Sequence, residues 1–140
     1  MRLLPEAAEV TCLAGRCGEG LENFHPRIEQ PFATEALDLL HALSTRLMAE
    51  KDIRQFPDIV SLAYWCRAGN LRHEAVKRAD GLLRMGRGTA FHVAPGNVPV
   101  NFAFSWAFGL LAGCANIVRL ASRDFPQTTV LLRHVAALLE

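Results

Sequence analysis

The chain has 140 residues, enough for one compact domain and hardly for two. Hydrophobic residues make up 51% and charged residues 21%, so the composition predicts a packed core and excludes wholesale disorder. The formal net charge is only +1, which excludes recruitment of nucleic acid or of an anionic membrane by overall charge.

The first half of the chain is predicted to be mainly helical. Residues 1–32 hold many glycines, prolines and polar residues, which favour irregular structure. From Thr34, a possible N-cap, apolar residues recur every three or four positions and predict a helix. A second helix is predicted from Pro57 to about Gly69, and a third, more polar helix over 72–83.

The pattern changes after Gly86. Apolar runs over 89–94 and 116–120 have the length of buried strands, and the helix predicted between them over 100–112 is apolar on nearly all sides. A last helix begins at Pro126. Strand, helix, strand and helix at these lengths predict a right-handed βαβ crossover with parallel strands, so the fold class is α/β.

One long segment raises the question of a membrane span, because no Asp, Glu, Lys or Arg lies between Arg87 and Arg119. Pro95 and Pro99 interrupt this segment. The unbroken piece from Pro99 to Ala112 would be only about 21 Å long, against the ~30 Å of a hydrocarbon core. We therefore expect no membrane span.

The termini and cysteines favour a cytoplasmic protein. Pro5, Glu6 and Glu9 interrupt what would be the apolar core of a secretory signal. The cysteines form no CxxC pair and have no histidine at a zinc-ligand spacing, so no metal site is predicted. We expect all four to be reduced. They are Cys12, Cys17, Cys66 and Cys114.

The turn at 95–99 and the loop at 121–125 follow the two predicted strands. The carboxyl ends of parallel strands meet at one edge of a sheet, which is where open α/β sheets bind ligands. Backbone N–H groups after Pro99 are suited to an anion. The dinucleotide glycine fingerprint is absent, because Gly86 and Gly88 precede the strand when they should follow it. These residues alone leave a nucleotide or anion site and a ligand-free turn both open.

The second half of the chain resembles the acyl-CoA reductase (LuxC-type) family of bacterial fatty-aldehyde synthesis, in the segment GTAFHVAPGNVPVNFAFSWAFGLLAGCANIVRLASRDFPQ. More distantly it is similar to the aldehyde dehydrogenase superfamily, whose pattern runs strand, Pro-x-Asn-x-Pro, helix, Ala-Gly-Asn, strand. The upstream segment FPDIVSLAYWCRAGNL extends the resemblance to about residues 53–130. Cys114 departs from it, because the family commonly has Asn there.

The resemblance implies an aldehyde-dehydrogenase-like (Rossmann-type) nucleotide-binding domain that begins within this chain. Residues 86–140 would be its first part, preceded by a mainly helical region at 1–85. The chain ends inside a helical pattern, so we expect it to be incomplete. Made alone, it is expected to be poorly soluble, because the apolar helix at 100–112 would lose its cover.

The resemblance also implies roles for individual residues. Asn97 matches the superfamily's catalytic-site Asn, whose amide helps to hold the oxyanion of a tetrahedral intermediate; the alternative is that Asn97 only caps the following helix. The preceding backbone would run along the nicotinamide end of the cofactor. It belongs to Val93, Ala94, Pro95 and Gly96.

The loop after the second strand would contact the rest of the cofactor. Leu120 falls where aldehyde dehydrogenases place a cofactor-binding Lys, and whether Arg119 replaces that Lys stays open. Arg123 falls where NAD-preferring members often have a Glu, and a cation there would pair with a 2′-phosphate, so we predict NADPH over NADH. Ser122 completes the expected cofactor-binding set.

The implied reaction is NADPH-dependent reduction of a fatty acyl-CoA, or of an acyl-enzyme, to the aldehyde through a cysteine thioester. By resemblance that cysteine lies downstream of residue 140, so this chain alone is expected to be inactive. Two alternatives stay open: a non-catalytic interaction module or vestigial fragment, and another aldehyde-dehydrogenase-like acyl reductase. The resemblance further implies an acyl-protein synthetase or acyltransferase as partner and a homo-oligomer at full length.

Three further features have a structural interpretation that we prefer to a functional one. His92 is interpreted as a buried strand histidine with one backbone partner, in preference to a proton relay. The aromatic residues of 102–108 are interpreted as core, in preference to an acyl-binding surface. Six basic residues are interpreted as a solvated face, and nucleic acid is not expected as a partner. They are Arg67, Arg72, Lys77, Arg78, Arg84 and Arg87.

Overall fold

A computed structural model describes residues 11–15 and 25–139. The elements of this part of the chain are α1 (Thr34–Ala49), the 3-10 helix η2 (Ile53–Gln55), α2 (Pro57–Trp65), α3 (Ala68–Lys77), β1 (Thr89–Val93), α4 (Asn101–Leu111), β2 (Ala115–Arg119) and α5 (Pro126–Leu139).

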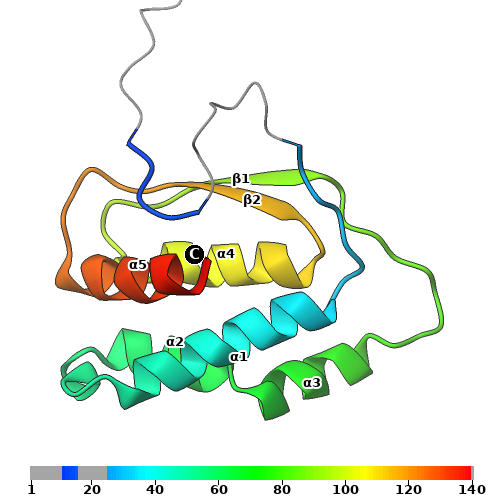
Figure 1. Cartoon of the computed structure of the whole chain (residues 1–140), viewed down its shortest axis with the longest axis horizontal. Coiled ribbons are helices and arrows are strands. Elements are labelled where there is room, and N and C mark those ends of the chain that lie inside the picture. The colour runs from blue at the N-terminus through cyan, green and yellow to red at the C-terminus, as the bar shows by residue number, and fades with distance from the viewer. Residues whose placement is uncertain (1–10, 16–24, 140) are drawn as a thin grey trace, which may run out of the picture.

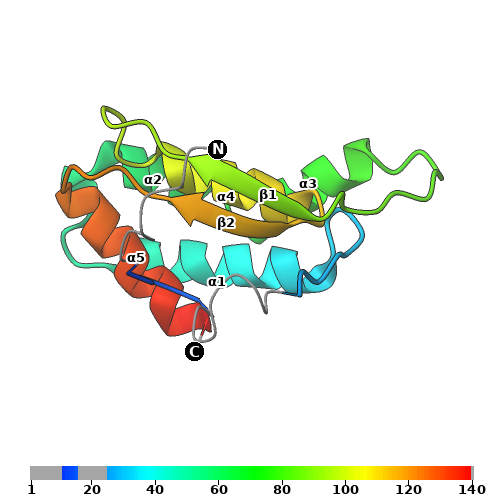
Figure 2. The same cartoon turned by 90° about the horizontal axis from the view of Figure 1, so that it is seen from above.

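The two strands form a layer that the helices cover from one side (Figures 1 and 2). β1 and β2 are parallel, with Thr89 opposite Ala115 and Val93 opposite Arg119. Helix α4 connects them, which confirms the predicted parallel strand–helix–strand order and the α/β class. Helices α4 and α5 lie next to the sheet, and α1, α2 and α3 form the layer beyond them (Figure 1).

A single hydrophobic core joins the helical region to the β1–α4–β2 unit. Ser44 is the one buried polar residue of the described chain, and its Oγ donates a hydrogen bond to the carbonyl oxygen of Ala63 at 2.5 Å. The polar group is therefore satisfied where α1 packs against α2. The fully buried large side chains are Leu40, Leu43, Leu47, Ile59, Leu62, Leu71, Leu131 and Cys66.

In the helical first half of the chain, the start of α2 agrees with the sequence, but the N-cap of α1 and the end of α2 differ. Pro57 opens α2 at the first helical turn, as predicted. Thr34 is the first residue of α1, but the N-cap is Ala33 and no side chain caps the helix, so the predicted capping role of Thr34 is wrong. Helix α2 ends at Trp65, well before Gly69.

Helix α3 also differs from the prediction, because it spans Ala68–Lys77 and not 72–83. Its start depends on a contact from another helix: the backbone N–H of Ala68 donates to Nδ1 of His41 in α1 at 3.3 Å. Leu71 is 1% exposed and fixes the inner face of α3 against the core. Gly69 therefore lies inside a helix because tertiary contacts outweigh its tendency to end one.

Three segments meet with their backbones in contact at the amino ends of the strands. Gly113 has φ +76°, the conformation predicted for it after α4, and a β-carbon there would be 2.2 Å from the Glu29 carbonyl oxygen. The N–H of Glu29 donates to the Gly113 oxygen, and the N–H of Gly86 donates to the Glu29 oxygen. A β-carbon at Gly86 would be 1.9 Å from the Gly113 oxygen. Gly86 thus serves chain packing at the end of the sheet opposite to the turn at 95–99.

The outer face of the sheet is uncovered in the described chain, which corrects the prediction of buried strands. Burial alternates along β1, and Phe91 and Val93 are each 63% exposed. Ala90 and His92, on the other face, are half-buried. The physical reason is that every described helix packs on that other face (Figure 1).

Helix α4 is apolar because it lies between the sheet and the other helices. Phe102 and Ala103 are buried, and Phe104 and Phe108 make edge-to-face contacts with Trp65, with ring centroids 6.3 and 5.1 Å apart. Aromatic packing therefore accounts for Phe104 and Phe108, although Phe108 remains 54% exposed. Within the described residues, no helix combines the length and the apolar character needed to cross a membrane.

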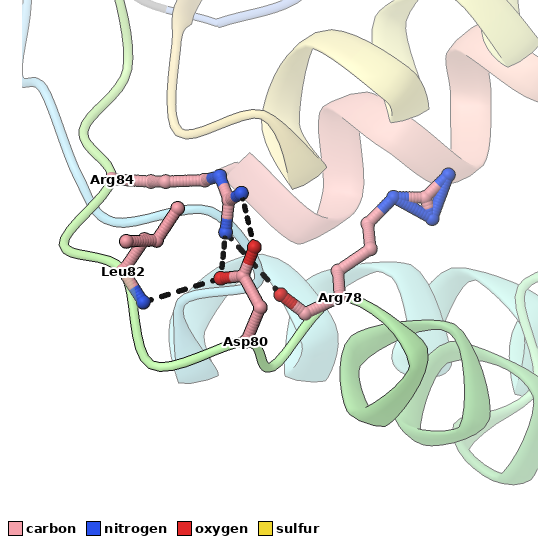
Figure 3. Close-up of polar contacts among 4 residues, drawn as sticks. All are labelled: Arg78, Asp80, Leu82 and Arg84. Atoms are coloured by element: carbon pink, nitrogen blue, oxygen red, sulfur yellow. Dashed lines mark hydrogen bonds and ion pairs between the residues drawn. The ribbon is translucent and has the colours of Figure 1, made fainter.

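An exposed loop connects α3 to β1 and is held by one ion pair (Figure 3). The guanidinium of Arg84 binds both carboxylate oxygens of Asp80, with 2.6 Å between Nη2 and Oδ2, and the N–H of Leu82 donates to Asp80 Oδ1 at 3.2 Å. The hydrogen bonds from Arg84 lower the pKa of Asp80 to about 2.

All six basic residues of the predicted solvated face are exposed, as expected for such a face.

Candidate functional site

The turn at 95–99 and the loop at 121–125 meet at the carboxyl edge of the sheet. The N–H of Ala94 donates to the Arg119 oxygen at 3.0 Å and extends the strand pairing by one residue. The two segments border a shallow hollow that is open to solvent. Thr128 Oγ1 donates to the Pro99 oxygen at 3.4 Å, so α5 is attached to the turn. The arrangement has the position at which α/β sheets bind ligands.

Asn97 lies exposed on the turn. Its side chain forms no hydrogen bond with any described residue, and α4 has Val100 as its N-cap with no side-chain cap. The alternative that Asn97 caps the helix is therefore wrong for this structure. Its amide is available to a ligand, and its Nδ2–H groups are donors of the kind that can hold an oxyanion.

The backbone predicted to contact the cofactor is divided between two surfaces. Ala94 and Pro95 border the hollow. Gly96 is exposed, and a β-carbon there would meet no atom within 4 Å. Val93 points to the uncovered outer face, and so does its strand partner Arg119, which is also exposed.

The loop after β2 places Arg123 beside the hollow. Its guanidinium lies 5.0 Å from the centre of the Phe125 ring and forms no ion pair within the described residues. Leu120 also borders the hollow, on the side opposite to Arg119. Ser122 is exposed and makes no hydrogen bond within the described part of the chain. Arg123 is thus the predicted cation that the structure places next to the turn.

The cysteines that the structure describes lie away from this edge. Cys66 is buried at the end of α2, and burial raises the pKa of its thiol to about 12. Cys114 follows α4 at the amino end of β2, the opposite end of the sheet. Cys12 is disulfide-bonded, so the expectation of reduced cysteines is wrong for that residue. Cys17 lies outside the described residues.

The sequence analysis did not predict a contact between two polar side chains on the inner face of the sheet. Nε2 of His92 in β1 lies 2.7 Å from Oδ1 of Asn116 in β2. The interpretation of His92 as a histidine with a backbone partner is therefore wrong, because its partner is a side chain of the neighbouring strand. The sequence does contain one signal for this contact: Asn116 lies within an apolar strand, where a half-buried amide needs hydrogen-bond partners.

Within the described residues, no cluster of three or more His, Cys, Asp or Glu side chains is arranged to hold a metal ion.

Residues 76–139 match the family model of the acyl-CoA reductases (LuxC). This segment is therefore similar to the acyl-CoA reductases (LuxC). It contains β1, the turn with Asn97, α4, β2, the loop with Arg123 and α5, so the whole candidate site lies inside the LuxC match. No curated protein and no solved structure matches the chain.

Proposed function

We propose that this chain supplies the cofactor-binding side of a cytoplasmic, NADPH-dependent acyl-CoA reductase, which makes a fatty aldehyde from an acyl-CoA through a cysteine thioester. The observation that carries the proposal is the LuxC match over residues 76–139, because it encloses the entire carboxyl edge of the sheet. The β1–α4–β2 unit would be the first part of an aldehyde-dehydrogenase-like nucleotide-binding domain.

The residues at the edge fit a phosphorylated nucleotide. Arg123 is a cation without an acidic partner among the described residues, and its stacking on Phe125 holds the guanidinium beside the hollow. Guanidinium groups bind phosphate through paired hydrogen bonds, so Arg123 suits the 2′-phosphate that distinguishes NADPH from NADH. Open space beside Gly96 allows a flat ring to approach the backbone of the turn.

When bound, NADPH supplies the hydride that reduces the acyl group. This chain's part is to orient and to stabilise. The side-chain N–H of Asn97 would donate to the thioester carbonyl oxygen and hold the negative charge that develops there. No described cysteine reaches this edge, so we propose that the acylated cysteine comes from sequence after residue 140. An acyl-protein synthetase or acyltransferase partner and a homo-oligomeric assembly belong to the same proposal.

The proposal is tested by titrating the chain with NADPH and with NADH, followed by nucleotide fluorescence. We expect NADPH to bind at least about tenfold more tightly, which corresponds to about 1.4 kcal/mol. Arg123→Glu should remove this preference, because a carboxylate repels a 2′-phosphate and accepts hydrogen bonds from ribose hydroxyls. Arg72→Glu, the same change on the exposed face of α3, serves as the control and should keep the preference. Equal affinities of the unaltered chain for both nucleotides would contradict the assignment of NADPH.

A further inference from the structure

The side chains of His92 and Asn116 join the two strands beneath α4. Ala90 is the strand partner of Asn116, and His92 lies two residues further along β1 on the same face. The contact is therefore a diagonal one across the pair of strands, with 2.7 Å between His92 Nε2 and Asn116 Oδ1. Both residues are half-buried, so water cannot fully replace this hydrogen bond if it is broken.

A second hydrogen bond fixes the direction of the first. Nδ2 of Asn116 donates to the carbonyl oxygen of Cys114 at 2.8 Å. A carbonyl oxygen only accepts, so the amide nitrogen must face Cys114 and the amide oxygen must face His92. His92 Nε2 consequently carries a proton and donates it, which selects the Nε2–H tautomer for the neutral ring.

Helix α4 closes over this pair at a glycine. A β-carbon at Gly109 would lie 1.8 Å from Asn116 Oδ1 and 3.1 Å from His92 Nε2. The carbonyl oxygen of Gly109 also accepts the N–H of Cys114 at 3.0 Å. A chain of three hydrogen bonds thus runs from α4 through Cys114 and Asn116 to His92. It joins the helix and both strands whose ends build the candidate site.

We propose that His92 and Asn116 are positioning residues: their hydrogen bond, closed under Gly109, ties the carboxyl half of β1 to the amino end of β2 beneath α4 and so sets the turn that carries Asn97. The inference rests on the proposed function only in naming NADPH as the ligand of the site; the positioning role itself does not depend on it. His92 is two residues before Ala94, whose N–H pairs with the Arg119 oxygen at the edge of the site. A change at His92 should therefore weaken the backbone hydrogen bond of Ala94 at the start of the turn.

The first test needs no cofactor and follows amide hydrogen exchange at Ala94. His92→Phe removes the donor, and we expect exchange at Ala94 to become about tenfold faster through local opening while exchange at Leu43 in α1 is unchanged. His92→Gln is the matched control, because its amide nitrogen can take the place of Nε2 and donate to Asn116. Exchange at Ala94 should then stay as in the unaltered chain. Unchanged exchange in His92→Phe, or equally fast exchange in His92→Gln, would overturn the proposal.

The second test separates positioning from stability. The double variant His92→Phe with Asn116→Leu removes both members of the pair and takes away a donor only from the Cys114 carbonyl oxygen, so its stability should recover in part. If the pair positions the site, the affinity for NADPH should remain about tenfold weaker in the double variant and normal in His92→Gln. Recovery of the affinity together with the stability would show a purely structural pair and overturn the proposal.

Nitrogen-15 NMR of the imidazole ring gives an independent readout. At alkaline pH, we expect the Nε2–H tautomer for His92, and the Nδ1–H tautomer would contradict the hydrogen-bond direction on which the proposal rests. If the unaltered chain binds no NADPH but the exchange and tautomer results are as expected, the proposed cofactor is wrong and the positioning role stands.

Discussion

At the scale of single residues, Gly109 decides how closely α4 approaches the sheet. Gly109→Ala would place a methyl group on Asn116 Oδ1, at a separation of 1.8 Å before any movement. We expect the free energy of unfolding to fall by about 1–3 kcal/mol, because the helix must shift or the side-chain pair must open. Urea titration followed by circular dichroism measures this change.

The control for that substitution is Gly69→Ala. Gly69 also lies within a helix, α3, but a β-carbon there meets nothing within 4 Å. Alanine is the better helix former, so the free energy of unfolding should be unchanged or rise by up to about 1 kcal/mol. Equal destabilisation by both substitutions would indicate that helix propensity, and not the approach of α4 to Asn116, governs position 109.

At this scale, the sequence indicates residues of local motifs but not contacts between residues that are far apart in the chain. Asn97 and Arg123 can be proposed from the sequence because the motif and the strand ends are local features, and both residues lie at the carboxyl edge of the sheet in the structure. The contact between His92 and Asn116 was missed, because 24 positions separate them and nothing in either neighbourhood names the partner. The cap that His41 provides for α3 was missed for the same reason, since it comes from another helix.

At the scale of elements, α1 and α5 are connected by a polar contact at Glu50. Its carboxylate accepts a hydrogen bond from Arg133 at 2.6 Å and lies 2.8 Å from Nε2 of His134. The hydrogen bond with His134, followed by that with Arg133, lowers the pKa of Glu50 below its ordinary 4.5. The carboxylate form is thus favoured by folding.

This shift predicts how stability depends on pH. Because the pKa of Glu50 is lower in the folded chain, its contribution is fully present above about pH 4.5 and is lost as the pH falls through the lowered value. Glu50→Gln should therefore lower the Tm near neutral pH, and the difference from the unaltered chain should shrink on acidification. Thermal unfolding over a series of buffers measures it.

Glu74→Gln is the matched control for Glu50→Gln. The pKa of Glu74 is also lowered, chiefly by its hydrogen bond with Lys77, but its partners lie within or directly after α3. Its loss leaves the contact between α1 and α5 intact, so the Tm should change less. A larger effect of Glu74→Gln would contradict the assignment of this pH dependence to the α1–α5 contact.

The elements themselves were predicted unevenly. Both strands, α4 and the start of α5 follow from apolar runs bounded by proline and glycine, and their boundaries were found within about two residues. The break between α2 and α3 was not predicted. Arg67 is extended between the two helices, and Gly69, where the sequence predicted an end, lies inside α3. Burial of Leu71 decides this geometry, and a local pattern cannot show which helix covers it.

At the scale of the whole molecule, the outer face of the sheet carries exposed apolar side chains in the described part of the chain. The sequence led us to expect exposure of α4, but Phe102, Ala103, Ala107 and Leu111 are all buried. Phe91 and Val93 are each 63% exposed on the outer face of the sheet, because the described helices lie on the other side, while on α4 Phe108 is 54% exposed. The sequence predicted buried strands from apolar runs, and an apolar run does not distinguish a strand covered on one face from a strand covered on two.

This one-sided packing predicts self-association of the chain through the outer face of the sheet. Phe91→Thr with Val93→Thr places a β-branched side chain suited to a strand at both positions and removes the apolar contact. The sedimentation coefficient at high concentration should therefore fall towards that of a monomer. Because both residues are 63% exposed, the free energy of unfolding of the monomer should change by no more than about 0.5 kcal/mol.

Val118→Thr makes the same chemical change on the opposite face, where Val118 packs against the core. A hydroxyl placed there lacks water, so the free energy of unfolding should fall by about 1–3 kcal/mol, while association through the outer face should persist. Association that survives Phe91→Thr with Val93→Thr would locate the contact elsewhere, and Phe108 on α4, 54% exposed beside Trp65, would be the next residue to change.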